Sequence, residues 1–414
     1  MMKLIAKHSD GLILSQDTFQ ISDITKREKA KNPAIIDGTL GVLNMEDGAF
    51  HTFKTVKEIL FNAVDSKIYA YTTSDGGPEY REAVLNWVFR NYKDDILNSL
   101  ECKVVATPGG TGAISASMFS SLDAGQTVLI PNLCWSPYFG IAEDKGLKIK
   151  KFTLIKDNKF NIADFIEKAN EIVAEQKKLV AIINNPCNNP TGYSMSDDEV
   201  EAIVDYLNSL KGIPCVLIYD IAYIDFSNDG MDVTRKQFKI FEKIQENILV
   251  SVCFSASKTF SIYGMRLGAQ IFLSKNKQAV IDFYNASNFT ARNNWSNCNT
   301  GAVNLLVAID KNENLKNQFL EEFTKVINMM KVRTSIFIKE ANAVGLKINP
   351  YHSGFFITIP TNHCDEAIEK LKKEKYVYLL AFGGNLRIAI CSLPAKDIEG
   401  LAGKIKDVLT EFGE

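Results

Sequence analysis

The sequence predicts an α/β protein with a large domain built on a doubly wound, mainly parallel sheet and a smaller α+β domain. From about residue 80 onward, β-branched apolar runs alternate with helical patterns, an order of elements typical of a parallel sheet covered on both faces. After about residue 305 the alternation stops and a long helical stretch follows. A chain of 414 residues is long enough for both parts.

The elements of the large domain follow from periodicity. Residues 79–92 and 111–122 have helical spacing, and the second helix opens directly after a glycine turn. A further helix is marked by a capping box, in which Ser196 precedes Glu199. Short apolar runs predict strands at 127–133, 147–155, 179–186, 215–223, 248–255 and 267–273.

The smaller domain is expected to combine the two ends of the chain. A long helix is predicted over 315–345, followed by the strand run FFITIP, a helix near 363–375, the run LRIAICSLP and a closing helix from 396. The first 50 or so residues lack a clear core of their own. We therefore predict a large domain at 52–305 and a discontinuous small domain at 1–51 and 306–414.

Composition excludes several classes of function. The net charge of −2 gives no electrostatic case for nucleic acid or an anionic membrane as a partner. No apolar run is long enough for a signal peptide or a membrane span. The eight cysteines contain no CxxC pair and are expected to be reduced thiols rather than a disulfide framework or metal site. These features predict a cytoplasmic protein.

One lysine stands out. In SASKTFSIYGMRLG (255–268), Lys258 follows the predicted strand 248–255, with hydroxyl residues around it and Arg266 downstream. A lysine after a strand is usually a solvated loop residue. A lysine held near a buried strand end is instead a candidate nucleophile for carbonyl groups, because desolvation lowers its pKa and frees the amine.

Other reactive side chains also follow strands, where ligands bind in α/β sheets. The glycine-rich TPGGTGA (107–113) opens a helix and suits a phosphate, but it is neither GxGxxG nor a P-loop. Trp135 offers a stacking surface, Asn189 a hydrogen-bond donor, and Asp220 and Tyr223 an acid and a phenol. Each feature alone is also compatible with an ordinary turn or core. Together they are the groups that pyridoxal phosphate requires.

The motifs NNPTG, DxAY and SxSKxFxxYGxRxG occur in this order. From about Gly38 to the last strand, the chain resembles the fold type I, pyridoxal-phosphate-dependent aminotransferases of class I, the aspartate and aromatic kind. The resemblance implies transfer of an amino group from an L-amino acid (aspartate, glutamate or an aromatic one) to a 2-oxo acid such as 2-oxoglutarate. It also implies ping-pong kinetics and pyridoxal 5′-phosphate as cofactor.

The resemblance assigns roles to the cofactor-binding residues. Lys258 would bond covalently to the cofactor aldehyde, and Asp220 would pair with the ring nitrogen. Tyr223 and Asn189 would bond the 3′-oxygen, and Trp135 would stack on the ring. The phosphate would be held by Gly109, Gly110, Thr111, Ser255 and Arg266.

The resemblance also implies a homodimer with shared active sites. Tyr71 resembles a tyrosine that reaches the neighbouring subunit's phosphate. Arg292 stands where an arginine reaches from the neighbouring subunit to a second substrate carboxylate; the alternative is an ordinary helix-end arginine. Arg387 resembles the clamp for the α-carboxylate, against which Gly41 would lie. The expected substrate-binding residues are therefore Gly41, Trp135, Asn189, Arg292 and Arg387.

Some positions depart from the family. Tyr138 stands where the aspartate subgroup often has a histidine behind the ring-pairing aspartate, Gly109 where some members have serine, and SNCNT (296–300) lacks the usual proline pair. Two alternatives stay open on the same fold: a carbon–sulfur β-lyase or related elimination enzyme, and a non-enzymatic regulator, although no DNA-binding extension is visible. An NAD enzyme is disfavoured because its fingerprint is missing.

Overall fold

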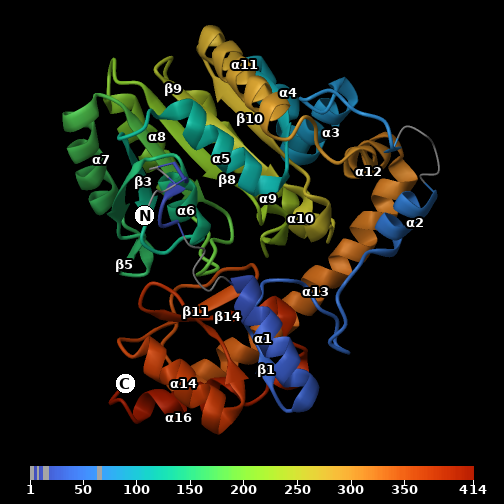
Figure 1. The fold of residues 1–414 in the computed structure, drawn as a ribbon, viewed down its shortest axis with the longest axis vertical. Coiled ribbons are helices and arrows are strands. Elements are labelled where there is room, and N and C mark those ends of the chain that lie inside the picture. The colour runs from blue at the N-terminus through green and yellow to red at the C-terminus, as the bar shows by residue number, and fades with distance from the viewer. Residues whose placement is uncertain (1–3, 7–8, 13–17, 63–67) are drawn as a thin grey trace.

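The computed structural model describes residues 4–6, 9–12, 18–62 and 68–414. Its centre is a seven-stranded sheet in the order β2-β10-β9-β8-β7-β3-β4 (Figure 1). All neighbours are parallel except those of β10, which is antiparallel to both β9 and β2. The strands are β2 (Glu101–Thr107), β3 (Thr127–Pro131), β4 (Lys148–Phe152), β7 (Leu179–Asn184), β8 (Cys215–Asp220), β9 (Ile248–Ser255) and β10 (Gly268–Ser274). This confirms the predicted α/β class.

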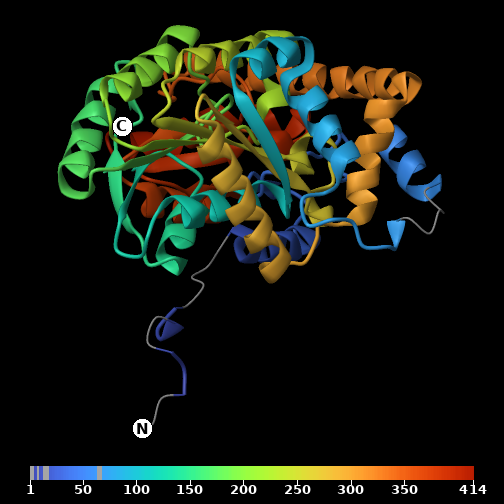
Figure 2. The ribbon, with the colours of Figure 1, turned by 90° about the horizontal axis from the view of Figure 1, so that it is seen from above.

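Both faces of the sheet are buried, which explains why the central strands are apolar throughout. In β8, Val216 and Ile218 join the core on one face, whereas Leu217 and Tyr219 join the core on the other. One face packs against α5 (Gly109–Ser121), α6 (Pro137–Asp144) and α11 (Lys277–Asn294). The other packs against α3 (Pro78–Phe89), α7 (Ile162–Gln176), α8 (Asp197–Ser209) and α12 (Thr300–Lys311) (Figure 2).

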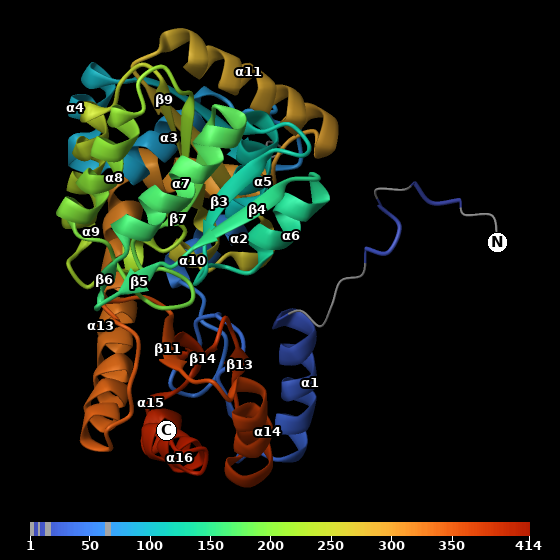
Figure 3. The same ribbon diagram turned by 90° about the vertical axis from the view of Figure 1, so that its left-hand side faces the viewer.

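A smaller α+β unit lies beside this sheet (Figure 3). Its antiparallel sheet has the order β11-β14-β13, and β1 pairs in parallel with β12. The unit comprises β11 (Phe356–Pro360), β12 (Val377–Tyr378), β13 (Leu380–Ala381), β14 (Asn385–Ala389), α14 (Cys364–Lys375), α15 (Ala395–Ile398) and α16 (Leu401–Thr410), with α1 (Thr18–Lys31) and β1 (Ile36–Asp37) from the N-terminal segment. The long helix α13 (Glu313–Ala343) runs from the large sheet to this unit. The pairing of β1 with β12 is in keeping with a discontinuous small domain, whose boundaries stay a prediction.

Three local features differ from the expected elements. The strand expected over 147–155 is interrupted: β4 ends at Phe152, and β5 (Ile155–Lys156) pairs with β6 (Lys159–Phe160). The closing helix is split into α15 and α16 at Gly400, whose φ of 77° breaks the helix. Strand β2 was not expected. The remaining helices are α2 (Lys54–Asn62), α4 (Lys93–Ser99), α9 (Met231–Lys236) and α10 (Ala256–Thr259).

The topology gathers several chain segments at one edge of the sheet. Strands β7, β8 and β9 run parallel and end at Asn184, Asp220 and Ser255. The antiparallel β10 begins at this edge, with Gly268 opposite Ser255. Helix α5 also begins here, at Gly109, directly after β2. Throughout the described ranges, no helix combines the length and apolarity needed to cross a membrane.

Candidate active site

A pocket lies at this edge of the sheet, and it brings together most of the residues predicted to bind the cofactor. Its predicted members are Gly110, Thr111, Trp135, Asn189, Asp220, Tyr223, Ser255, Lys258 and Arg266. Ile114, Asn184 and Ala222 complete the lining. Residues separated by more than a hundred positions thus meet because the strands that precede them end at the same edge of one sheet.

Lys258 lies in α10, the single helical turn that follows β9. Its Nζ stands 5.5 Å from the centroid of the Tyr223 ring. Burial lowers the pKa of Lys258 from 10.5 to about 8, against the opposing influence of the Asp220 carboxylate. An amine with this pKa is neutral far more often near pH 7 than an ordinary lysine, so Lys258 suits attack on an aldehyde.

Asp220 ends β8 and is almost fully buried. Its Oδ1 accepts a hydrogen bond from the Ala222 backbone N–H at 3.0 Å, and its Oδ2 accepts one from the Tyr138 hydroxyl at 2.5 Å. Both donors are neutral. Burial raises the pKa of Asp220, while these two hydrogen bonds and Lys258 act in the opposite direction. A buried carboxylate with only neutral donors favours a cationic ligand group, such as a protonated pyridine nitrogen.

Tyr138 stands near the start of α6, and no part of its side chain is exposed. Its ring meets that of Trp135 edge to face, with 5.5 Å between centroids and an interplanar angle of 87°. Burial, and then the Asp220 charge, raise the pKa of Tyr138 well above 10. The phenol therefore keeps its proton and remains a hydrogen-bond donor to Asp220.

The start of α5 and the Arg266 side chain form the end of the pocket that suits a phosphate. Arg266 donates to the Ser257 hydroxyl at 3.2 Å and to the carbonyls of Tyr263 at 2.8 Å and Pro108 at 3.3 Å. A Cβ on Gly109, whose φ is 74°, would lie 2.4 Å from Arg266 Nη2. Glycine adopts this conformation without strain and leaves room for the Arg266 guanidinium, and a helix start beside an arginine is an arrangement suited to an anion.

Asn184 was not singled out from the sequence, yet it organises this edge. Its Nδ2 donates to the Asp220 carbonyl at 2.9 Å, and its Oδ1 accepts from the Asn189 N–H at 2.8 Å. Asn189 is thereby held at the pocket, which it lines together with Tyr223. The available signal was an amide side chain as the last residue of a buried strand.

Arg387, on β14, is 5% exposed and lies beside the same pocket. Its guanidinium donates to Thr39 O at 2.9 Å and Asn189 Oδ1 at 3.3 Å, and its Nε has no partner among the described residues. Burial lowers the pKa of Arg387 to about 10. A buried guanidinium that meets only neutral acceptors and whose Nε–H has no partner among the described residues suits a ligand carboxylate.

Phe356 links Arg387 to Gly41. The Arg387 guanidinium carbon lies 4.5 Å from the centroid of the Phe356 ring. A Cβ on Gly41 would lie only 2.2 Å from Phe356 Cζ. The absence of a side chain at Gly41 therefore allows the ring to support the guanidinium from one side. The sequence did not single out Phe356, because a phenylalanine in a strand is ordinarily a core residue.

Tyr71 and Arg292 do not line this pocket. Tyr71 is 89% exposed, and Arg292 is an exposed residue of α11 that donates to Ser296 Oγ at 3.3 Å. Their two segments are joined by hydrogen bonds from Asn297 to Thr72 O and from Thr300 to Ala70 O. Their assignment to a neighbouring subunit's site stays a prediction.

The chain is similar to known aminotransferases over nearly its whole length. The family model described as "Aminotransferase class I and II" matches residues 40–405. The mitochondrial aspartate aminotransferase of Dictyostelium discoideum is 23% identical over 388 residues, which cover 90% of this chain and 87% of that protein. The aromatic-amino-acid aminotransferase of Escherichia coli (strain K12) is 23% identical over 376 residues, covering 88% of this chain and 90% of that protein.

Solved structures of aminotransferases are also similar to this chain. The crystal structure of an aminotransferase from Anaerococcus prevotii is 31% identical, with a TM-score of 0.93 over 98% of this chain and 99% of that chain. An aromatic-amino-acid aminotransferase from Burkholderia pseudomallei, covalently bound to pyridoxal phosphate, has the same fold at 20% identity, with a TM-score of 0.80 over 98% of this chain and 100% of that one. The pocket described above has the groups that this cofactor needs: an amine of lowered pKa, a buried carboxylate hydrogen-bonded only by neutral donors, and a helix start suited to an anion. The chain therefore belongs to the class I and II aminotransferases, and it is a pyridoxal-phosphate-dependent enzyme that transfers amino groups between amino acids and 2-oxo acids.

Proposed function

We propose that this aminotransferase accepts dicarboxylic amino acids, aspartate or glutamate, or aromatic ones, and transfers their amino group to a 2-oxo acid such as 2-oxoglutarate. The observation that carries the proposal is the buried Arg387 with a free Nε beside the pocket of Lys258 and Asp220. Such a guanidinium recognises the α-carboxylate shared by every amino acid and 2-oxo acid. The names of the aspartate and aromatic relatives support the narrower choice.

The cofactor would be held along the whole pocket. Lys258 would bind the aldehyde, Asp220 the ring nitrogen, and Tyr223 with Asn189 the 3′-oxygen, while Trp135 covers the ring. The phosphate would lie against Gly109, Gly110, Thr111, Ser255 and Arg266. When bound, pyridoxal phosphate supplies an aldehyde that captures the amino group and a pyridinium ring that accepts the electron pair of the substrate Cα–H bond.

The protein's own groups would then act on the bound substrate. Arg387 would fix the α-carboxylate and thereby orient the Cα–H bond toward Lys258. The Lys258 amine, kept partly neutral by burial, would take the proton from Cα as a general base and, as a general acid, deliver it to the former aldehyde carbon of the cofactor. Asp220 would stay ionised and keep the ring nitrogen protonated. Release of the first 2-oxo acid before the second binds would give ping-pong kinetics.

We further propose that the enzyme is a cytoplasmic homodimer with shared active sites. The exposed Tyr71 and Arg292 lie on two segments that are tied together, outside this chain's own pocket. Tyr71 would then reach the partner's phosphate, and Arg292 a second carboxylate of its substrate. All eight cysteines are free thiols, in keeping with a reducing compartment.

Initial-rate kinetics test the proposal. The donors are glutamate, aspartate or phenylalanine, and the acceptors are 2-oxoglutarate or oxaloacetate. Double-reciprocal plots should give parallel lines. The amino acid formed from the acceptor should appear in a one-to-one ratio with the 2-oxo acid formed from the donor. Activity with other amino acids alone would contradict the proposed substrates. Release of pyruvate and ammonia from a cysteine-like substrate, without turnover of any 2-oxo acid acceptor, would favour a β-lyase.

A further inference from the structure

Helix α10, which carries Lys258, is too short to hold its own position. It comprises Ala256–Thr259 and closes one i→i+4 hydrogen bond, from the Phe260 N–H to the Ala256 carbonyl. A single turn is unstable by itself, because nucleation fixes several residues for one bond. Contacts outside the turn must therefore hold it, among them the backbone hydrogen bond from the Ala256 N–H to the Leu267 carbonyl and the contacts of the side chains around Lys258.

The side chains on either side of Lys258 point to different anchors. The Ser257 hydroxyl accepts a hydrogen bond from Arg266, whereas the Thr259 hydroxyl donates to Oδ2 of Asp225 at 2.6 Å. The ring of Phe260 packs on Trp87, with 5.0 Å between centroids. Thr259 is 1% exposed and Asp225 2% exposed, so water cannot substitute for this contact.

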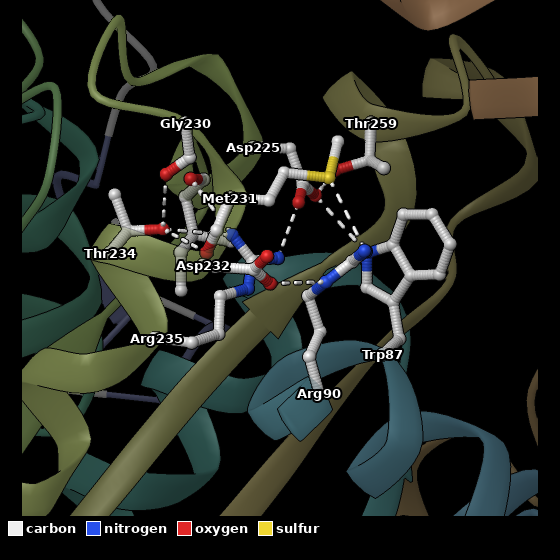
Figure 4. Close-up of polar contacts among 10 residues, drawn as sticks. Trp87, Arg90, Asp225, Gly230, Met231, Asp232, Thr234, Arg235 and Thr259 are labelled. Carbon is white, nitrogen blue, oxygen red and sulfur yellow. Dashed lines mark hydrogen bonds and ion pairs between the residues drawn. The ribbon is translucent and has the colours of Figure 1, made fainter. Parts of the chain in front are cut away.

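Asp225 is the centre of a buried polar cluster (Figure 4). Its Oδ2 also accepts from Trp87 Nε1 at 3.1 Å, and its Oδ1 forms an ion pair with Arg235. Neither Asp225 nor Arg235 has any exposed side-chain surface. Arg235 in turn donates to the Ile224 carbonyl at 3.2 Å. Trp87 and Arg235 therefore hold the carboxylate in place independently of Thr259, since charge-assisted hydrogen bonds are among the strongest.

Asp225 also belongs to the segment that directly follows β8 in the chain. It follows Tyr223 by two residues, within the short 3₁₀ turn Ile224–Phe226. Asp220 and Tyr223 precede it on the same segment and line the pocket. The hydrogen bond between Thr259 and Asp225 consequently ties the segment of the acid and the phenol to the turn of the lysine.

We propose that Asp225 and Thr259 are positioning residues that set Lys258 at its working distance from Asp220 and Tyr223. Neither residue lines the pocket, so they act through Lys258 rather than on the substrate. The proposal rests on the role of Lys258 given under Proposed function. Lysine is flexible, and a backbone shift of about 1 Å at a reacting group costs roughly a hundredfold in rate.

Replacement of Thr259 by valine tests this, because valine keeps the shape and removes only the donor. We expect the T259V holoenzyme to bind a full equivalent of cofactor but to show an altered visible circular dichroism band, which reports the orientation of the bound ring against the protein. Its kcat should fall roughly tenfold to a hundredfold, with KM changed by less than about threefold. T259S, which restores the hydroxyl, should restore both the spectrum and kcat.

Thr25 provides the matched control. It is also 1% exposed, and its hydroxyl donates to the Ile21 carbonyl within α1, away from the pocket. T25V should keep the wild-type dichroism and kcat. The inference is overturned if T259V behaves as T25V does, with at most a lower Tm, or if T259S fails to restore the dichroism.

Two further outcomes are decisive. If T259V does not fold, T259A removes the same hydroxyl, and its dichroism, kcat and KM are measured instead. If neither variant folds while T259S does, the hydroxyl is needed for folding and the inference is wrong. If K258A keeps wild-type turnover, the role of Lys258 itself fails, whatever the Thr259 variants show.

Discussion

Tyr138 donates its hydroxyl hydrogen to Oδ2 of Asp220 over 2.5 Å, and both side chains are buried. Burial alone favours a protonated Asp220, and this hydrogen bond opposes that effect. A histidine, which often occupies this place in the aspartate subgroup, titrates near neutral pH. The phenol, with its pKa raised well above 10, does not, so the support it gives Asp220 is constant over the working pH range.

The Y138F variant should therefore move the acid limb of the pH–kcat profile to higher pH. The hydrogen bond from Tyr138 lowers the pKa of Asp220, so loss of this bond raises the pKa. As the pH falls, Asp220 in Y138F therefore becomes protonated at a higher pH than in the wild type. A hydrogen bond to a charged group contributes ~1.5–3 kcal/mol, which corresponds to a displacement of about one to two pH units. Tyr206, a buried tyrosine that donates to Asn170, gives the control Y206F. Coincident acid limbs for Y138F and wild type would show that Tyr138 only fills space.

Asp220 itself should be needed for the chemical step rather than for binding. In D220N the neutral amide cannot keep the ring nitrogen protonated, so the cofactor ring accepts electrons less well. We expect kcat to fall roughly 100- to 1,000-fold, the range typical for loss of a preorganised electrostatic group. The control is D310N, because Asp310 accepts a hydrogen bond from Asn86 on another part of the protein. A near-normal kcat combined with a raised KM would contradict the assignment.

The fold was predictable where periodicity and burial agree. The run ILVSVCFS (248–255) became β9 with the same bounds, because a strand buried on both faces is apolar throughout. The unexpected β2 shows the limit. Its first three residues are largely exposed and only Val104–Thr107 are buried, so half of the strand carries no signal. Nor does periodicity reveal that β10 runs antiparallel, since its direction is set by partners far away in the chain.

The same limit applies to the site. Lys258, Asp220 and Tyr223 could be predicted because each follows a strand and carries reactive chemistry. Asp225 and Thr259 could not, because their contact joins positions 34 residues apart, and a threonine beside a lysine has no pattern of its own. Phe356 and Asn184 were likewise indistinguishable from core and turn residues until their partners, Arg387 and Asn189, were placed against them.

Arg292 should decide the substrate class. If it binds a side-chain carboxylate, R292A removes one partner of a charge pair, at a cost of ~2–5 kcal/mol. At about 1.4 kcal/mol per tenfold change, kcat/KM for aspartate should fall roughly 30-fold to several thousand-fold. Phenylalanine offers no side-chain charge and should lose less than about tenfold. Equal losses with both substrates would make Arg292 a structural residue.

The shared-site arrangement requires a dimer under working conditions. Tyr71 is 89% exposed and does not line its own pocket, so a second copy would supply this group if it contacts the phosphate. Multi-angle light scattering at micromolar concentration should give twice the chain mass of 46.2 kDa. A monomer with full activity would rule out shared sites.

The proposed mechanism depends above all on Lys258 as the residue that carries the cofactor. Treatment of the yellow holoenzyme with borohydride should fix the cofactor irreversibly, and peptide mapping should locate the added mass on the peptide that contains Lys258. The K258A variant should bind the cofactor without such a label and should not turn over amino acids. A label on a different lysine, or wild-type turnover by K258A, would contradict the proposed role of Lys258.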